Sequence, residues 1–273
     1  MAASYPDSYP DNVTSLTNRK ADSAAGPAIR KIGLSDLTDA LHRGWDDFKA
    51  VPSHALVLCV IYPILGLVLA RMTLGYSVLP LLFPLAAGFA LLGPFAAIGL
   101  YELSRRRENG EEPTVSQAIS VLKSPSFGAM LGLGAMLLTL FVVWIASAQA
   151  IYTATFGYAP AASIPDFAQH ILTLPEGRAL MLVGCSVGFL FALVALCVSV
   201  VSFPLMLDRH ASMADAILTS LRVVIANPVA MACWGFIVAA LLFVGSLPLF
   251  MGLAVVIPVL GHATWHLYRK VVV

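Results

Sequence analysis

The chain has 273 residues, of which 59% are hydrophobic and only 11% are charged, and its formal net charge is +1. A soluble domain carries about a quarter charged residues, so this chain has too few charges to cover a water-facing surface. It also lacks a basic tract, so no nucleic-acid partner is indicated. The composition therefore predicts an integral membrane protein.

The polar N-terminus sets the expected domain boundary. Residues 1–30 are rich in Ser, Asp, Ala, Pro and Asn without periodicity, which predicts a disordered tail. Residues 31–273 are expected to form a single integral membrane domain. The first apolar block begins near residue 54, too late for a cleaved signal peptide, so we expect a retained membrane anchor.

Three short segments have apolar residues spaced by three or four, as in amphipathic helices that lie at a membrane surface. They cover residues 34–50, 114–123 and 212–226, and the last two begin with capping-box patterns. Their predicted apolar faces consist, in chain order, of Leu34, Leu37, Leu41, Trp45 and Phe48, of Val115, Ala118, Ile119 and Leu122, and of Met213, Ile217, Leu221 and Val224.

Long apolar blocks predict six membrane-spanning helices. The expected spans cover residues 54–72, 77–103, 127–156, 178–207, 229–245 and 249–268, with a proline-containing loop between the third and the fourth. Only residues 246–248 separate the last two spans, which predicts an antiparallel hairpin. The predicted fold is therefore an all-α, polytopic membrane helix bundle with three interfacial amphipathic helices.

The basic residues predict the orientation of this bundle. Of the 16 Lys and Arg residues, all except Arg71 and Arg178 fall on one side of the six predicted spans. Because basic residues are concentrated in cytoplasmic loops, both termini are expected in the cytoplasm.

Prolines suggest a repeat and breaks in the spans. Each amphipathic segment is followed by a proline and then by an expected membrane hairpin, which favours a threefold helix-plus-hairpin repeat; prolines placed by chance at helix boundaries are the alternative. Further prolines fall in the spans, where they either open backbone carbonyls to an ion or substrate or simply fit the packing. They are Pro63, Pro80, Pro84, Pro94, Pro204 and Pro258.

Two runs, GLYELSRR at residues 99–106 and GHATWHLYR at residues 261–269, resemble signatures of one bacterial family. It is a domain-of-unknown-function family of predicted integral membrane proteins, found largely in proteobacteria. The resemblance begins near residue 32, reaches the C-terminus and includes the runs at residues 44–48 and 123–128. It implies a multi-pass protein of the bacterial inner membrane, and it implies no activity.

Few residues could carry chemistry. His262 and His266 are four apart on one helix face and could share a metal ion, with His54 as a third ligand. Glu102 and Asp208 are expected at the same membrane level, where Glu102 could instead form a helix-end ion pair with Arg105, and Asp208 one with Arg209. Trp265, between the two histidines, favours the alternative that this polar rim only anchors the helices at the interface.

No catalytic arrangement is recognisable. The chain contains no GxSxG motif and no phosphate-binding glycine loop, so we expect neither an enzyme nor a bound cofactor. The four cysteines all lie in apolar blocks, which argues against a disulfide framework or a zinc ribbon.

Three functions remain open at this point. The first is a non-enzymatic protein that transports a small solute or ion. The second is a scaffold or assembly factor that binds other membrane proteins or itself, favoured by the small-residue pairs Gly128–Gly132 and Gly184–Gly188. The third is a metal or redox site at the polar rim. In each case the lipid bilayer is an expected partner.

Overall fold

The computed structural model describes residues 26–51, 81, 84–85, 88, 93–112, 114–158, 164–248 and 250–273, and the elements named in this part of the chain are all helices. The all-α prediction is confirmed for these residues. The expected span at residues 54–72 and most of the one at 77–103 lie outside them. The helices are α2 (Leu34–Ala50), α6 (Gly93–Ala96), α7 (Ile98–Glu108), α8 (Val115–Ile119), the 3₁₀ helix η3 (Ser120–Lys123), α9 (Phe127–Phe156), α10 (Ile164–Thr173), α11 (Pro175–Ser199), α12 (Ser202–Arg209), α13 (Met213–Ala226), α14 (Pro228–Ser246) and α15 (Leu253–Val271).

Three helical stretches among the described residues are long and apolar enough to cross a membrane: Phe127–Phe156, Pro175–Arg209 and Pro228–Ser246. They coincide with the third, fourth and fifth predicted spans. Helix α15, where the sixth span is expected, is not among them, because its second half carries two histidines, an arginine and a lysine. The count of six spans therefore stays a prediction.

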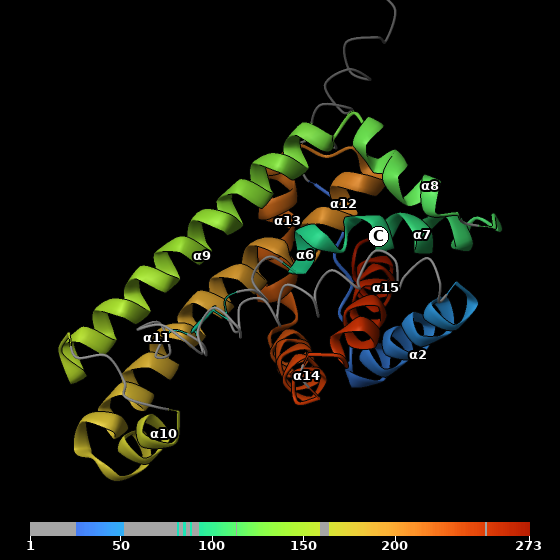
Figure 1. The fold of residues 1–273 in the computed structure, drawn as a ribbon. Coiled ribbons are helices and arrows are strands. Elements are labelled where there is room, and N and C mark those ends of the chain that lie inside the picture. Colours follow the sequence, from blue (N-terminus) through green and yellow to red (C-terminus); the bar gives the residue numbers. More distant parts are fainter. Residues whose placement is uncertain are drawn as a thin grey trace, which may run out of the picture.

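The described helices form two regions (Figure 1). Helices α9 and α11 pack against each other as long rods, with the short α10 at their far end. At the other end α15 packs against α2 and α7. The largest fully buried side chains include two tryptophans and two tyrosines, and three of these four lie on α7 and α15. The best-packed part of the described chain is therefore where α2, α7 and α15 meet.

The predicted fourth span is broken near its end. Helix α11 ends at Ser199 and α12 begins at Ser202, because Pro204 lacks an N–H and its ring would clash with the carbonyl of the residue four positions earlier. The Ser202 hydroxyl donates to the Val198 carbonyl oxygen at 2.6 Å. The carbonyl that Pro204 leaves without its helical donor is that of Val200, so the serine bond does not bear on it, and an open ion site at this break stays a prediction.

The loop predicted between the third and fourth spans contains a helix. The prolines predicted a loop here, but Pro165 lies in the first turn of α10. At the second helical position its missing N–H costs no hydrogen bond, so the proline is compatible with a helix. Asp166 in the first turn also suits a helix N-terminus.

The turn between α14 and α15 is longer than predicted, since it takes residues 247–252. Helix α14 packs against α15, as a hairpin requires. The two ends meet closely at Gly245 and Gly252: a Cβ atom on Gly252 would lie 2.7 Å from the Gly245 carbonyl oxygen, so only glycine fits there.

The three amphipathic segments are helices, as predicted: α2, α8 with η3, and α13. The expected caps also form. The Thr114 backbone N–H donates to Gln117 Oε1 at 2.7 Å, and the Asp215 N–H donates to Ser212 Oγ at 3.2 Å. Local sequence therefore determines where these helices begin.

The predicted apolar faces of these helices, expected to point toward lipid or the bundle, are only partly buried. In α2, Leu37 and Phe48 are buried as expected, but Leu34 is 57% exposed and Trp45 is 43% exposed. Small or polar residues take the inward positions instead, because they let neighbouring backbones approach. These inward residues are Ala40, Gly44 and Asp47 in α2, Ala118 in α8, and Ala216, Thr219 and Ser220 in α13, whereas Ile119, Leu122, Leu218, Leu221 and Ile225 are exposed.

The segment before α2 is fixed to the C-terminus. The Arg30 N–H donates to the Val271 carbonyl oxygen, and the Val273 N–H donates to that of Ala28, each at 2.9 Å. Buried Asn227 accepts from the Ile32 N–H at 2.8 Å. Residues 28–30, which fall at the end of the predicted tail, thus have defined partners, and residues 1–25 lie outside the described part.

Candidate functional site

Close packing of α2 on α15 creates the candidate site. The helices run antiparallel, so that Lys270 pairs with Asp39 near the start of α2, at 2.9 Å, and Asp47 near its end faces the histidines. Between these points Gly44 touches α15 so closely that a Cβ atom there would lie 2.6 Å from the Ala263 nitrogen. Backbone contact at Gly44 therefore brings Asp47 within hydrogen-bond reach of α15.

Asp47 is the centre of five polar side chains from three helices. Its Oδ2 accepts hydrogen bonds from Ser104 Oγ at 2.6 Å and from His266 Nε2 at 2.8 Å. Its Oδ1 accepts from Arg107 Nη1 at 2.6 Å. Ser104 Oγ also lies 2.7 Å from His262 Nδ1. We call Asp47, Ser104, Arg107, His262 and His266 the Asp47 cluster.

The cluster is buried yet charged. His262 is 0% exposed and Asp47 only 6%. Burial alone would raise the pKa of the Asp47 carboxyl, but hydrogen bonds from His266 and Ser104 and the nearby imidazoles outweigh it and hold the pKa below its ordinary value of 3.8. Asp47 is therefore an ionised carboxylate whose oxygens are all occupied by donors.

The hydrogen bonds also indicate which nitrogen of His262 carries its proton. The Ser104 hydroxyl has one hydrogen, and at 2.6 Å from an ionised carboxylate this hydrogen points to Asp47. Ser104 Oγ must then accept from His262, so the proton of the His262 ring is on Nδ1. Its Nε2 is left as a bare acceptor, and this buried atom has no hydrogen-bond partner among the described residues.

A serine, a histidine and an aspartate meet here without forming a hydrolase triad. In a triad the carboxylate bonds to one imidazole nitrogen and the serine to the other. Here Asp47 Oδ2 bonds to Ser104 directly, and it lies 4.0 Å from the same His262 nitrogen that contacts the serine. The buried serine therefore has no base in the position that would activate it.

The acidic residues predicted for the polar rim have other partners. Glu102 is 2% exposed and accepts from Arg105 Nε at 2.8 Å and from Arg106 Nε at 2.6 Å. The predicted ion pair with Arg105 thus forms, and a second arginine shares the carboxylate. Glu102 is therefore a neutralised helix-end group.

Asp208 and Trp265 belong to a separate set of contacts at the end of α15. Asp208 accepts from the Tyr268 hydroxyl at 2.7 Å and lies 3.9 Å from Arg209 Nε. The Trp265 indole N–H donates to Glu108 at 3.0 Å, and this indole is buried rather than placed outward as an interfacial anchor.

The structure thus brings together only part of the predicted rim. His262 and His266 both point inward, to Ser104 and Asp47, while His54 lies outside the described residues. No group of three His, Cys, Asp or Glu side chains in the described part is arranged to hold a metal ion. Each histidine already has a hydrogen-bond partner, so the geometry favours a hydrogen-bonded cluster over a metal centre.

Sequence reasoning missed Asp47, Ser104 and Arg107. A signal for Asp47 was present: it follows Ala40 and Gly44 at spacings of seven and three, on the face of small residues that allows close packing. An acidic side chain on such a face must meet buried polar partners, since an unpaired buried charge is costly.

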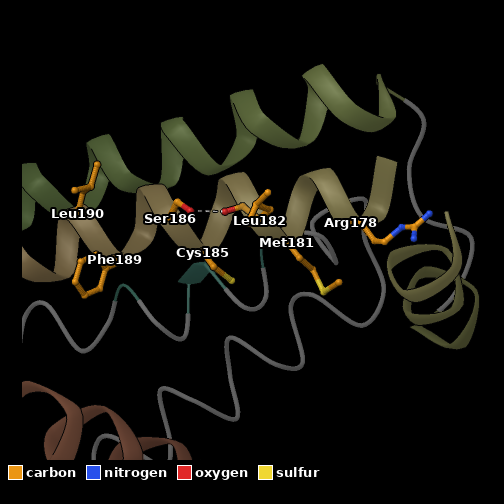
Figure 2. Close-up of a pocket in the computed structure, with 7 residues that line it drawn as sticks. All are labelled: Arg178, Met181, Leu182, Cys185, Ser186, Phe189 and Leu190. Atoms are coloured by element: carbon orange, nitrogen blue, oxygen red, sulfur yellow. Dashed lines mark hydrogen bonds between the residues drawn. The ribbon is translucent and has the colours of Figure 1, made fainter. Parts of the chain in front are cut away.

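Two hollows lie on the surface of the described residues. A small cleft of about 170 Å³ opens beside the cluster and is lined by Arg43, Glu108, His266, Arg269 and Lys270. The other is a wide, apolar hollow along α11, lined by Arg178, Met181, Leu182, Cys185, Ser186, Phe189 and Leu190 (Figure 2). Its one hydroxyl, that of Ser186, donates to the Leu182 carbonyl oxygen at 2.7 Å, so of these two hollows among the described residues it is the small cleft that adjoins the Asp47 cluster.

Comparison with known proteins agrees with the predicted class. Residues 81–208 match the model of a family described as "Predicted integral membrane protein (DUF2189)". The matched range contains α6 to α11 and all of α12 except Arg209, together with the run at residues 99–106. The resemblance to a domain-of-unknown-function family of predicted integral membrane proteins is confirmed for residues 81–208, whereas its expected extent from residue 32 to the C-terminus, with the run at residues 261–269, lies outside the match and stays a prediction. No curated protein and no solved structure matches the chain.

Proposed function

Because residues 81–208 match a family of predicted integral membrane proteins, we propose that the chain is a six-span protein of the bacterial inner membrane that transports a small solute or ion without enzymatic chemistry. Three span-length apolar helices support the membrane assignment. The distribution of Lys and Arg supports cytoplasmic termini, which make the number of spans even. The repeat belongs to this proposal too, with α2, α8 and α13 as its three amphipathic helices.

One observation supports the transport function: an ionised carboxylate and two imidazoles are buried together where α2, α7 and α15 meet, and the partly exposed guanidinium of Arg107 pairs with the carboxylate. Ionisable groups buried in a membrane protein cost folding free energy, so they are usually retained for a function such as ion or proton movement. Paired groups at a helix end could serve packing alone, as Glu102 does. The Asp47 cluster differs, because it holds a buried acceptor, His262 Nε2, that the described residues leave open.

Ion flux into liposomes tests this function. The purified full-length chain is reconstituted into liposomes that contain a pH-sensitive dye and either K⁺ or Na⁺ chloride, and an external pH step is applied. We expect faster dissipation of the pH difference than in protein-free liposomes, and loss of this activity in Asp47→Asn. Asp46→Asn is the matched control, because Asp46 is exposed and pairs with Lys49. Equal rates with and without protein, under both salts, would contradict proton transport and proton-coupled cation transport.

A scaffold function is the second candidate, and the glycines of α9 and α11 favour it. Cβ atoms on Gly128 and Gly184 would have no described atom within 4 Å, whereas Gly132 and Gly188 already face Met213 and Trp144. The open half of each small-residue pair could receive a helix of another protein. Cross-linking at Gly184→Cys in native membranes, followed by identification of the attached protein, tests this candidate.

The topology has its own test. A reporter fused at Pro165 is expected on the periplasmic side, and one fused at Val273 on the cytoplasmic side. A cytoplasmic signal at Pro165 would overturn the six-span arrangement.

A further inference from the structure

We propose that the apolar hollow along α11 binds one anionic phospholipid, whose acyl chains lie along the hollow and whose phosphate pairs with Arg178. This lipid is a bound partner of the protein and not the transported ion, so the site does not depend on the transport function. Only the leaflet that supplies the lipid rests on the topology proposed above, which places this end of α11 on the periplasmic side.

The residues that line the hollow share one face of α11, because they recur at spacings of three or four. Cys185 and Ser186 have small side chains and lie midway along this face, between the larger Leu182 and Phe189. The hollow has a volume of about 740 Å³, which falls within the size range of small-molecule sites. Since the Ser186 hydroxyl donates to its own helix, the middle of the hollow offers a ligand apolar contacts.

The length of the hollow matches one leaflet of a bilayer. Figure 2 shows Arg178 at one end and Phe189 and Leu190 at the other. At the rise of an α-helix, the distance along the axis from Arg178 to Leu190 is about 18 Å. The hydrocarbon core of a bilayer is about 30 Å thick, so one leaflet contributes about 15 Å. An acyl chain that follows the hollow therefore brings its headgroup to the level of Arg178.

Arg178 gives this end of the hollow a positive charge. Its side chain is exposed, and no residue in the described part of the chain forms an ion pair with it. The nearby acid Glu176 does not line the hollow, because residues two positions apart on a helix do not face each other. Arg178 is also the fourth residue of α11, so the positive end of the helix dipole lies beside it. An anion at this end of the hollow is therefore attracted and not repelled.

A phospholipid matches both parts of the hollow. Its acyl chains cover the exposed Leu182 and Phe189, and its phosphate accepts two parallel hydrogen bonds from the guanidinium. An apolar helix of another protein would cover the same side chains but leave Arg178 without a counter-charge. Because the bilayer is as apolar as the hollow, apolar contacts do not select one lipid over another. Selection between lipids must therefore come from the headgroup beside Arg178.

Lipid titration of the purified full-length protein, followed by native mass spectrometry, tests the site. The protein in mild detergent is titrated with anionic phosphatidylglycerol and, separately, with zwitterionic phosphatidylcholine that has the same acyl chains. We expect one phosphatidylglycerol to bind per chain about fivefold more tightly than phosphatidylcholine, the factor that corresponds to one Lys or Arg beside an anionic lipid.

Three variants and a control locate the bound lipid. Arg178→Gln should weaken phosphatidylglycerol binding about fivefold, to the level of phosphatidylcholine, whereas Arg178→Lys, which keeps the charge, should retain most of the preference. Ser186→Trp should weaken binding of both lipids, because the indole fills the hollow, and circular dichroism checks that this variant is folded. Lys123→Gln is the matched control, since Lys123 is exposed and precedes α9 at the end opposite α10, and it should leave binding unchanged.

Four results would overturn the proposal. Equal binding of the two lipids, or unchanged binding in Arg178→Gln, would remove the role of Arg178. Unchanged binding in a folded Ser186→Trp would show that the lipid lies elsewhere and that something else covers the hollow, such as a second copy of the chain. Equal losses in Arg178→Gln and Lys123→Gln would indicate a general charge effect. Ion flux that depends on Asp47 would survive each of these results, so failure of the lipid site and failure of the transport function are distinguishable.

Discussion

His266 Nε2 donates to Asp47 Oδ2 across 2.8 Å, although 219 positions of the chain separate the two residues. This bond fixes the end of α2 to α15 in a buried site. Because Asp47 also accepts from Ser104 and Arg107, its removal would leave three donors without an acceptor.

We therefore expect Asp47→Asn to lower the free energy of unfolding by about 2–3 kcal/mol, the range for a hydrogen bond to a charged group together with unsatisfied partners. Asp46→Asn should change it by less than about 0.5 kcal/mol, because Asp46 is exposed. Denaturant unfolding in mild detergent, followed by circular dichroism, measures both. Equal effects of the two variants would show that the Asp47 cluster does not hold α2.

Acid should remove the contribution of ionised Asp47 to the free energy of unfolding. Its folded-state pKa lies below the ordinary 3.8, so its stabilisation is fully present above pH of about 4 and is lost as the pH falls through the folded-state pKa. The difference in unfolding free energy between the unmodified protein and Asp47→Asn should stay constant from pH 7 to about pH 4 and shrink below it. A difference that disappears already between pH 7 and 5 would assign the effect to another group.

Gly44→Ala should destabilise the protein by about 1–3 kcal/mol, although alanine normally favours a helix interior over glycine by about 1 kcal/mol. The reason is the 2.6 Å approach of the new Cβ to the Ala263 nitrogen. Gly184→Ala in α11 is the control, since its Cβ would meet no described atom within 4 Å. Thermal unfolding of both variants should move in opposite directions; a stabilised Gly44→Ala would contradict the close packing of α2 on α15.

Phe48→Asp should disrupt α2 more than Trp45→Asp, although the apolar spacing places both residues on the same face. Phe48 is 8% exposed, whereas Trp45 is 43% exposed. Trp45 should instead contact lipid.

The amount of folded protein extracted in detergent and its free energy of unfolding measure how far each aspartate variant disrupts α2. Contact of Trp45 with lipid is measured by the quenching of tryptophan fluorescence by brominated lipids. The unmodified protein is compared with Trp45→Leu. If Trp45→Asp unfolds the protein as readily as Phe48→Asp, the exposed position of the indole is wrong.

The sequence by itself determined the features that depend on local periodicity and composition. Blocks of apolar residues located the third to fifth spans to within a few residues. The capping patterns at Thr114 and Ser212 located the starts of α8 and α13, because a cap depends only on residues three positions apart. The ion pair of Glu102 with Arg105 was likewise local, since one helical turn separates them.

Only the tertiary structure decided what each helix buries. Apolar spacing placed Leu34 and Trp45 on the same face of α2 as Leu37 and Phe48, but lipid is as apolar as the core of a membrane protein, so hydrophobicity does not decide which of them are buried. Close approach at Gly44 turned Asp47 inward instead. The partners of Asp47 come from α7 and α15, far away in the chain, and no local pattern could have paired a carboxylate on α2 with the two histidines of α15.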